Sequence, residues 1–135
     1  MCSLNMGTMN FGLFSMNKPG KEWKYDWEQD HLENSRDFVF KNTFLDIETI
    51  LSEMGGKRGA RFEFECHDLS HINTLAHFLD RGLVKRPIFV QFVVGVLGGM
   101  PAHPESLFVM KQASDRLLGN DCEFSVAAAG RLQFR

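Results

Sequence analysis

The sequence has few cysteines, and their arrangement excludes several classes of protein. The 135-residue chain has three, Cys2, Cys66 and Cys122, and no two of them form a C-x-x-C pair. A disulfide-rich secreted scaffold or a cysteine-based zinc site needs closely spaced cysteines. We therefore expect reduced thiols and a cytoplasmic protein.

The sequence also lacks a long apolar run and an excess of either charge. Its longest apolar stretch, Pro87–Met100, is interrupted by Gln91 and three glycines, and it is shorter than the ~20 residues that cross a bilayer. No secretion signal is indicated. The 15 Lys and Arg nearly balance the 17 Asp and Glu, for a net charge of −2. We expect no membrane and no nucleic-acid partner, because both select clustered cations.

What the sequence does contain is an alternation of strand and helix patterns, within a composition typical of one globular domain. Strands are predicted at 1–6, 61–66, 87–96 and 122–129, and helices at 43–54, 70–81 and 104–118. The second strand alternates, with Glu63 and Glu65 on one face and Phe62 and Phe64 on the other. The third is so apolar that we expect it to be buried on both faces.

Apolar spacing predicts which side chains of the helices point inward. Asn42 or Thr43 is expected to cap the first helix. The inward positions are Phe44, Ile47, Ile50, Leu51 and Met54 in the first helix and Leu107, Met110, Ala113 and Leu117 in the last.

Repetition of strand and helix implies parallel strands with helices packed outside them. Two architectures fit: an open doubly wound sheet, or part of a (βα)8 barrel. Glu63 and Glu65 favour the barrel, because two carboxylates on one strand face need a wet interior such as the mouth of a barrel. Four strands cannot close a barrel, so residues 1–135 would form a single domain covering about half of one. Residues 15–40 lack a steady period and are interpreted as a loop excursion over the mouth or a partner-contact loop.

Four segments resemble the β-keto acid cleavage enzymes, the family of 3-keto-5-aminohexanoate cleavage enzyme. They are S-L-N-M-G-T-M-N-F at Ser3–Phe11, R-F-E-F-E-C-H-D at Arg61–Asp68, F-V-V-G-V-L-G-G at Phe92–Gly99, and F-S-V-A-A-A-G-R-L-Q at Phe124–Gln133. The resemblance implies a zinc-dependent TIM-barrel transferase that converts a β-keto acid and acetyl-CoA to acetoacetate and a new acyl-CoA. The chain would begin inside the fourth βα unit of the barrel and stop after its seventh strand.

The resemblance also assigns roles to individual residues. Thr8 and Asn10 match a substrate-contacting pair at a strand end, and Glu63 matches the acid of a P-E-x-E strand motif, although Phe62 replaces its proline. We expect Glu63 to be catalytic and Glu65 and Arg131 to bind substrate. The family's H-x-H zinc pair and late Glu are absent, so the zinc ligands are expected outside this chain. Leu132 stands where the family often has His.

Each of these assignments has a structural alternative. Thr8 and Asn10 fit ordinary turn chemistry. Glu63 and Glu65, ~6–7 Å apart from strand rise, could move a proton or steady a metal-bound ligand, or could pair with Arg61 or Arg131. Gln91 is interpreted as a satisfied core residue.

Two further motifs remain open. His67 and His71 resemble the spacing of a zinc helix, but a capped helix with surface or rim histidines is favoured. The glycines of Gly95–Pro104 could admit a CoA phosphate or serve a tight turn.

The function expected is therefore that of a β-keto acid cleavage enzyme, with this chain inactive alone. A non-catalytic half-barrel assembly domain and a small zinc hydrolase using His67 and His71 are the alternatives. The expected partners are a β-keto acid, a CoA ester and further copies of the protein in a homo-oligomer, since unpaired strand edges promote association.

Overall fold

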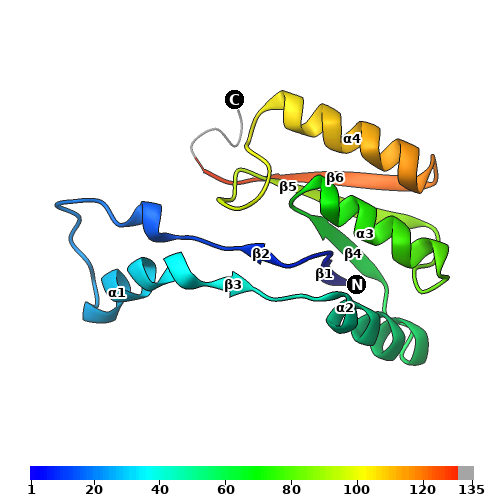
Figure 1. Cartoon of the computed structure of the whole chain (residues 1–135), viewed down its shortest axis with the longest axis horizontal. Helices are drawn as coiled ribbons and strands as arrows, with labels where there is room; N and C mark the ends of the chain where they lie inside the picture. The colour runs from blue at the N-terminus through cyan, green and yellow to red at the C-terminus, as the bar shows by residue number, and fades with distance from the viewer. Residues whose placement is uncertain (131–135) are drawn as a thin grey trace.

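The protein is built on a parallel β-sheet, as the sequence predicted. The computed structural model describes residues 1–130. Within them, a four-stranded parallel sheet has the order β1-β4-β5-β6, with β1 at Cys2–Asn5, β4 at Phe62–Cys66, β5 at Ile88–Val94 and β6 at Cys122–Ala128. Figure 1 shows these strands beside the helices that connect them.

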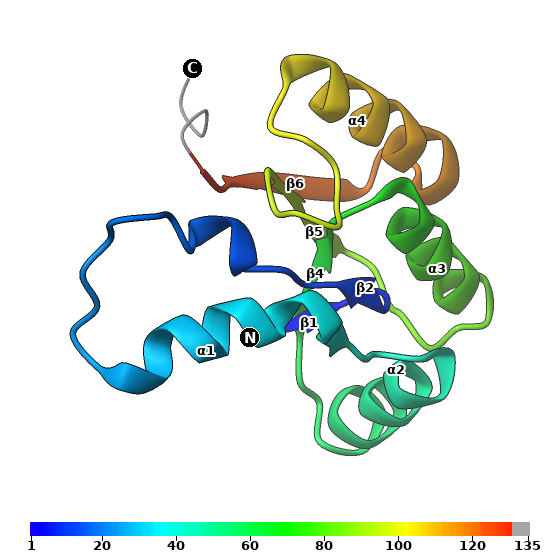
Figure 2. The ribbon, with the colours of Figure 1, turned by 60° about the vertical axis from the view of Figure 1, so that its left-hand side comes forward.

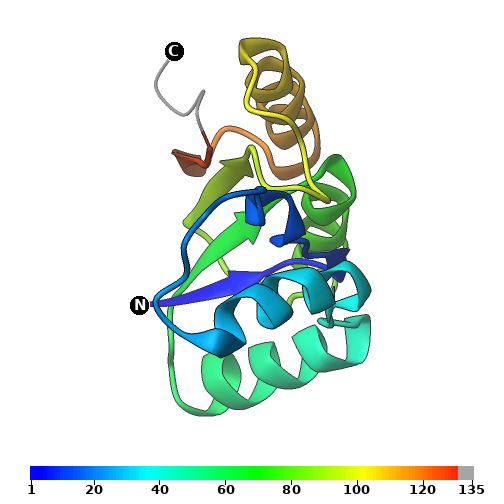
Figure 3. The same cartoon turned by 90° about the vertical axis from the view of Figure 1, so that its left-hand side faces the viewer.

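The connecting helices lie on the same face of the sheet. They are α2 (Phe44–Ile50), continued by a π-helical segment η3 (Leu51–Lys57), then α3 (Leu69–Asp80) and α4 (Pro104–Leu118). Figures 2 and 3 show all three helices on one side of the strands. Part of the predicted fold is thus confirmed: parallel strands with flanking helices. Among residues 1–130, no helix covers the other face.

The hydrophobic core lies between this helical layer and the sheet. Strand residues Phe64, Val90 and Phe92 pack in one cluster with helix residues such as Ile72 and Met110. Alternation explains the pattern, because every second side chain of a strand points to the same face. In β5 the residues Ile88, Val90, Phe92 and Val94 are buried, and the residues between them are half-buried. The expectation that this strand is buried on both faces was wrong.

Capping residues fix where two of the helices begin. The Thr43 hydroxyl accepts a hydrogen bond from the Asp46 backbone N–H, and the Asp46 carboxylate accepts one from the Thr43 N–H, which forms a capping box. The Asp68 carboxylate accepts a hydrogen bond from the Ser70 N–H at the start of α3. Both caps satisfy amide groups that have no partner inside a helix.

Some predicted inward positions were wrong. Phe44 is exposed, Met54 lies in η3 and is also exposed, and Leu117 is exposed while its neighbour Leu118 is fully buried. Adjacent positions of a helix lie 100° apart, and an apolar stripe is about as wide. The apolar pattern alone therefore does not decide which of two adjacent leucines points inward.

Residues 9–40 form an arm that leaves the sheet (Figure 1). Strands β2 (Met9–Asn10) and β3 (Val39–Phe40) pair antiparallel at its base, and it contains η1 (Phe14–Met16), α1 (Asp26–Asn34) and η2 (Ser35–Asp37). The segment 15–40 is therefore not the continuous loop that the sequence indicated. The sequence did not predict α1, because Leu32 is its one buried residue and a single inward position gives no helical spacing.

Candidate functional site

The face of the sheet away from the helices is lined by polar side chains. Strand pairing places Ser3 beside Glu63 on β1 and β4. The next row along the strands runs from Asn5 and Glu65 to Gln91 and Ser125. We call the set Ser3, Asn5, Glu63, Glu65, Gln91 and Ser125 the polar face. Four strands contribute to it, so distant parts of the sequence meet there.

Glu63 lies at the centre of a hydrogen-bond network on the polar face. Its carboxylate accepts hydrogen bonds from Ser3 Oγ at 3.2 Å and from Gln91 Nε2 at 2.9 Å. Gln91 Nε2 also lies 3.3 Å from Ser125 Oγ, which accepts from it. The half-buried Glu63 side chain is thus held between β1 and β5 by neutral donors.

Glu65 has one partner on the polar face, because Asn5 Nδ2 donates to its carboxylate at 3.2 Å. Among the ion pairs within residues 1–130, none involves Glu63 or Glu65. The alternative pairing with Arg61 is therefore not found, and Arg131 lies outside the described residues. No cation in the described part of the chain neutralises either carboxylate.

Gln91 is hydrogen-bonded, as expected, but its side chain does not lie in the core. It lies on the polar face, where its amide donates to Glu63 and orients that carboxylate. The signal that could have found it is its position in an otherwise apolar strand. Ser3, Asn5 and Ser125 were missed because only strand register brings them to the same face.

Thr8 and Asn10 lie apart from the polar face, beyond the carboxyl end of β1. They line a hollow of about 340 Å³ together with Asp68, Ser70, His71 and three neighbours, and neither Glu63 nor Glu65 is among its lining residues. Thr8 Oγ1 accepts a hydrogen bond from the Asn42 backbone N–H at 2.9 Å. The structure thus places Thr8 and Asn10 at the end of the sheet where α/β proteins bind ligands. Glu63 and Glu65 lie within β4, with Glu63 near the amino end of that strand.

His67 and His71 are buried, which corrects the interpretation that they lie on the surface or rim. Their exposed fractions are 7% and 3%. His71 Nδ1 accepts a hydrogen bond from the His67 backbone N–H at 3.3 Å, and His71 also bonds the backbone of Thr8. Burial lowers the pKa of His67, and burial followed by the nearby His67 lowers the pKa of His71. Both shifts favour the neutral form of the imidazole.

The described residues do not provide a metal site. Within 1–130, no group of three or more His, Cys, Asp and Glu side chains could hold a metal ion. His71 already uses Nδ1 in the contact with His67, and the two rings are 6.0 Å apart at a steep angle. The arrangement does not support the alternative of a zinc hydrolase.

The glycine-rich loop after β5 is used for close packing. The Gly95 and Met100 amides donate to the carbonyls of Met100 and His67 at 2.8 and 2.7 Å. A Cβ at Gly98 would lie 2.1 Å from the Asn10 carbonyl oxygen, and Gly98 has φ +105°. These contacts favour the turn interpretation over phosphate binding, because the Gly95, Gly99 and Met100 amides already donate within the chain.

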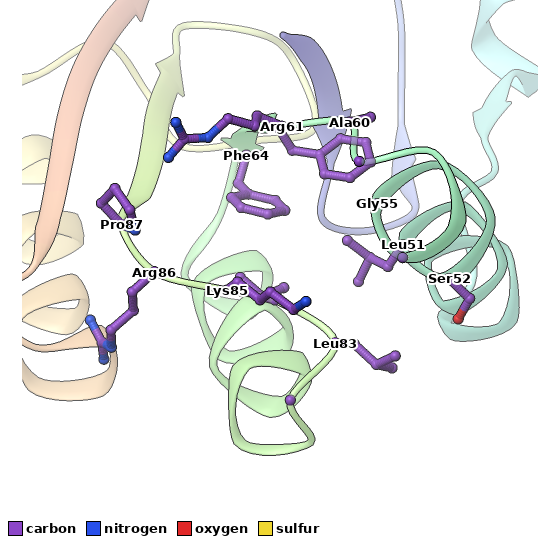
Figure 4. Close-up of a pocket in the computed structure, with 15 residues that line it drawn as sticks. Leu51, Ser52, Gly55, Ala60, Arg61, Phe64, Leu83, Lys85, Arg86 and Pro87 are labelled. Atoms are coloured by element: carbon purple, nitrogen blue, oxygen red, sulfur yellow. The ribbon is translucent and has the colours of Figure 1, made fainter.

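Another hollow lies at the opposite end of the sheet from Thr8 and Asn10. It has a volume of about 500 Å³ and is lined by residues that precede β4 and β5, including Arg61, Lys85 and Arg86 (Figure 4). The Arg86 guanidinium donates to the Leu118 carbonyl at the end of α4. Because active sites of parallel α/β folds lie at the carboxyl ends of the strands, we assign this hollow no catalytic role.

The chain has an α/β fold whose four-stranded parallel sheet carries polar side chains from all four strands on the face away from the helices. The model of the beta-keto acid cleavage enzyme family matches residues 1–135. The chain is 61% identical over 133 residues to 3,5-dioxohexanoate:acetyl-CoA acetone transferase from Paraburkholderia graminis, covering 98% of this chain and 43% of that protein. It is 29% identical over 134 residues to 3-keto-5-aminohexanoate cleavage enzyme from Acetoanaerobium sticklandii, covering 99% of this chain and 39% of that protein.

The chain belongs to the beta-keto acid cleavage enzyme family, which confirms the resemblance seen in the sequence. It spans about two fifths of the length of the curated relatives it matches. No helix within residues 1–130 is long and apolar enough to cross a membrane.

Proposed function

We propose that this chain forms part of a transferase that cleaves a β-keto acid with acetyl-CoA, giving acetoacetate and a new acyl-CoA. The observation that carries the proposal is the match of the whole chain to the family. The printed name of the 61% identical relative supports both the group transfer and the co-substrate. Free cysteines at positions 2, 66 and 122 support a reducing compartment such as the cytoplasm.

We infer that the sheet is an arc of a (βα)8 barrel whose remaining strands lie outside this chain. Helices on one face and polar side chains on the other support this inference, since a barrel has its helices outside and its active site within the mouth. Phe124 and Val126 support it too. They are exposed on the helical side of β6, where the next helix of a barrel would cover them.

The polar face supplies the proposed chemistry. Glu63 would take up and return a proton on the substrate, because its carboxylate is positioned by Ser3 and Gln91 and carries no ion pair within residues 1–130. Thr8, Asn10 and Glu65 would orient the keto acid through hydrogen bonds, and Arg131 remains a candidate for its carboxylate.

Zinc is implied by the family resemblance, but the described residues do not fit it, as they offer no group of three ligands. We therefore place the zinc ligands outside this chain and assign no step of the reaction to the metal here.

A chimera would test the proposed function. The 133 matched residues of the Paraburkholderia graminis relative would be replaced by those of this chain, and acyl transfer from acetyl-CoA would be followed with 3,5-dioxohexanoate as substrate. We expect the chimera to be active. Glu63→Gln should lower its kcat by at least about 100-fold, since general acid-base groups contribute about 10²–10⁴ to the rate. Glu65→Gln should have a smaller effect, mainly on KM.

Glu48→Gln is the matched control, because Glu48 is exposed on α2 and should leave kcat unchanged. A folded chimera without activity would favour the non-catalytic assembly domain. An active chimera with equal kcat in Glu63→Gln and Glu48→Gln would remove Glu63 from the mechanism and leave the family assignment intact.

A further inference from the structure

The two carboxylates of β4 are held differently, although they lie on the same face of the same strand. Glu63 accepts hydrogen bonds on both of its carboxylate oxygens, from Ser3 and from Gln91. Glu65 accepts a hydrogen bond from Asn5 on one oxygen. Within residues 1–130, the bond from Gln91 is therefore what distinguishes the two side chains.

Strand register does not explain why Gln91 bonds Glu63. In the pairing of β4 with β5, Gln91 lies directly beside Glu65, whereas the β5 residue beside Glu63 is Phe89. The Gln91 side chain nevertheless reaches back along the strands, and its Nε2 lies 2.9 Å from Glu63 Oε1. Because Glu65 is the direct neighbour, another contact must hold the amide toward Glu63.

Hydrogen-bond chemistry fixes the orientation of the Gln91 amide. An ionised carboxylate only accepts hydrogen bonds, so the amide group beside Glu63 is the NH2 group and not the carbonyl. The same nitrogen lies 3.3 Å from Oγ of Ser125, the residue directly beside Gln91 on β6. An amide nitrogen has two hydrogens, and both are thus used, one for Glu63 and one for Ser125.

Ser125 anchors the Gln91 side chain on the side away from β4. Glutamine is a long side chain that loses much rotamer freedom when it is fixed, so a single hydrogen bond holds it poorly. Bonds to β4 and β6 at once hold the amide between the two neighbouring strands. Both bonds join residues of one sheet within 1–130, so they do not depend on what covers the polar face in the full protein.

We propose that Gln91 is a positioning residue for the transfer reaction, and that Ser125 acts through Gln91 to hold the Glu63 carboxylate in place. This rests on the proposed function, in which Glu63 takes up and returns a proton. A general base must lie within hydrogen-bond distance of the proton that it takes. A misplacement of about 1 Å can lower a rate about 100-fold. Neither Gln91 nor Ser125 touches the substrate in this arrangement.

Kinetics of the full natural protein test the proposal, with acyl transfer from acetyl-CoA followed with 3,5-dioxohexanoate as substrate. Gln91→Met removes the amide at similar length, and it should lower kcat about 10- to 100-fold and leave KM within about twofold. Gln112→Met is the matched control, because Gln112 is exposed on α4, and its kcat should equal that of the wild type.

Two variants of Ser125 keep the test open should Gln91→Met not fold. Ser125→Ala removes the anchor and should lower kcat about 3- to 10-fold, which is the size of one neutral hydrogen bond. Ser125→Thr keeps the hydroxyl and should retain most of the wild-type kcat. A kcat of Ser125→Ala equal to that of the wild type would overturn the role of Ser125.

The double variant distinguishes positioning from a general structural effect. Once Gln91 is replaced, Ser125 has no contact that leads to Glu63. Gln91→Met combined with Ser125→Ala should therefore be no slower than Gln91→Met alone. Losses of kcat that multiply would overturn the proposal, because Ser125 would then act without Gln91. A rise in KM as large as the loss of kcat in Ser125→Ala would also overturn it, by placing Ser125 on the substrate.

Crystal structures of the variants give a readout that does not need activity. The Glu63 carboxylate should leave its wild-type position in Gln91→Met and keep it in Gln112→Met. With an active wild type, an unchanged Glu63 in Gln91→Met would overturn the positioning role and leave the proposed function standing. An inactive wild type would instead overturn the proposed function and, with it, the kinetic role of Gln91.

Discussion

Gly7 is a position where a single methyl group should disturb the hollow around Thr8 and Asn10. It follows β1 and precedes Thr8, and a Cβ there would lie 2.5 Å from Cδ2 and 2.6 Å from Nε2 of His71. Ordinary carbon contacts are about 3.5–4.0 Å, so the ring or the backbone must move by about 1 Å. The ring is not free to move, because it is buried and its Nδ1 accepts from the His67 N–H. Overpacking of this kind costs about 1–3 kcal/mol, and we expect Gly7→Ala to lie in the upper half of that range.

A double-mutant cycle separates this clash from other effects of the methyl group. His71→Ala alone should cost about 2–4 kcal/mol, because it leaves a cavity and an unpaired His67 N–H. In the double variant the new methyl group enters the vacated space. The combined loss should therefore be smaller than the sum of the two by about 1–3 kcal/mol.

Urea unfolding of each variant, with midpoint and slope compared, is the measurement. Gly56→Ala is the control, because a Cβ at Gly56 meets no atom closer than 3.9 Å and should change stability by less than about 1 kcal/mol. Additive losses in the cycle, or equal midpoints for the Gly7 and Gly56 variants, would refute the reasoning.

Three further predictions follow from burial and capping. The pKa values of His67 and His71 are lowered in the folded protein, so the unfolded chain binds protons first as the pH falls below about 6.5. The urea concentration at the unfolding midpoint should therefore decrease when the pH is lowered from about 7 to about 5.5. The decrease should be smaller in a His67→Leu variant. Burial raises the pKa of the Cys66 thiol, so a thiol reagent should modify the exposed Cys2 within minutes and Cys66 only after unfolding; equal rates would contradict the packing. Thr43→Ala should lower the unfolding free energy by about 1 kcal/mol through loss of the cap, and an unchanged urea midpoint would show that the cap contributes nothing.

The elements with a strong local signal were predictable from the sequence. Strict alternation placed Phe64 and Cys66 in the core and Glu63 and Glu65 on the opposite face, and the structure agrees. Helix α3 begins one residue before the expected Ser70 and ends one residue before Arg81. These features depend on neighbours within a few residues, which the sequence contains in full.

Features that depend on distant partners were not predictable. Helix α1 has a single buried residue and packs on short 3-10 segments of the arm, so it has no apolar stripe. Gln91 meets Glu63 only because β4 and β5 pair in a particular register. Periodicity gives the face on which a side chain lies, but the register decides which side chains share it.

The chemistry of the polar face itself favours one way of completing the sheet. A parallel sheet is normally covered on both faces, and a second helical layer would bury Glu63, Glu65 and Asn5 against apolar side chains. Burying two carboxylates without a cation is unfavourable, and no described cation pairs with them. The relatives have more than half of their length beyond the matched region, enough chain for further strands. Closure into a barrel would leave the same carboxylates in an enclosed, hydrated interior. The second face of the sheet would then be enclosed without burying uncompensated charge.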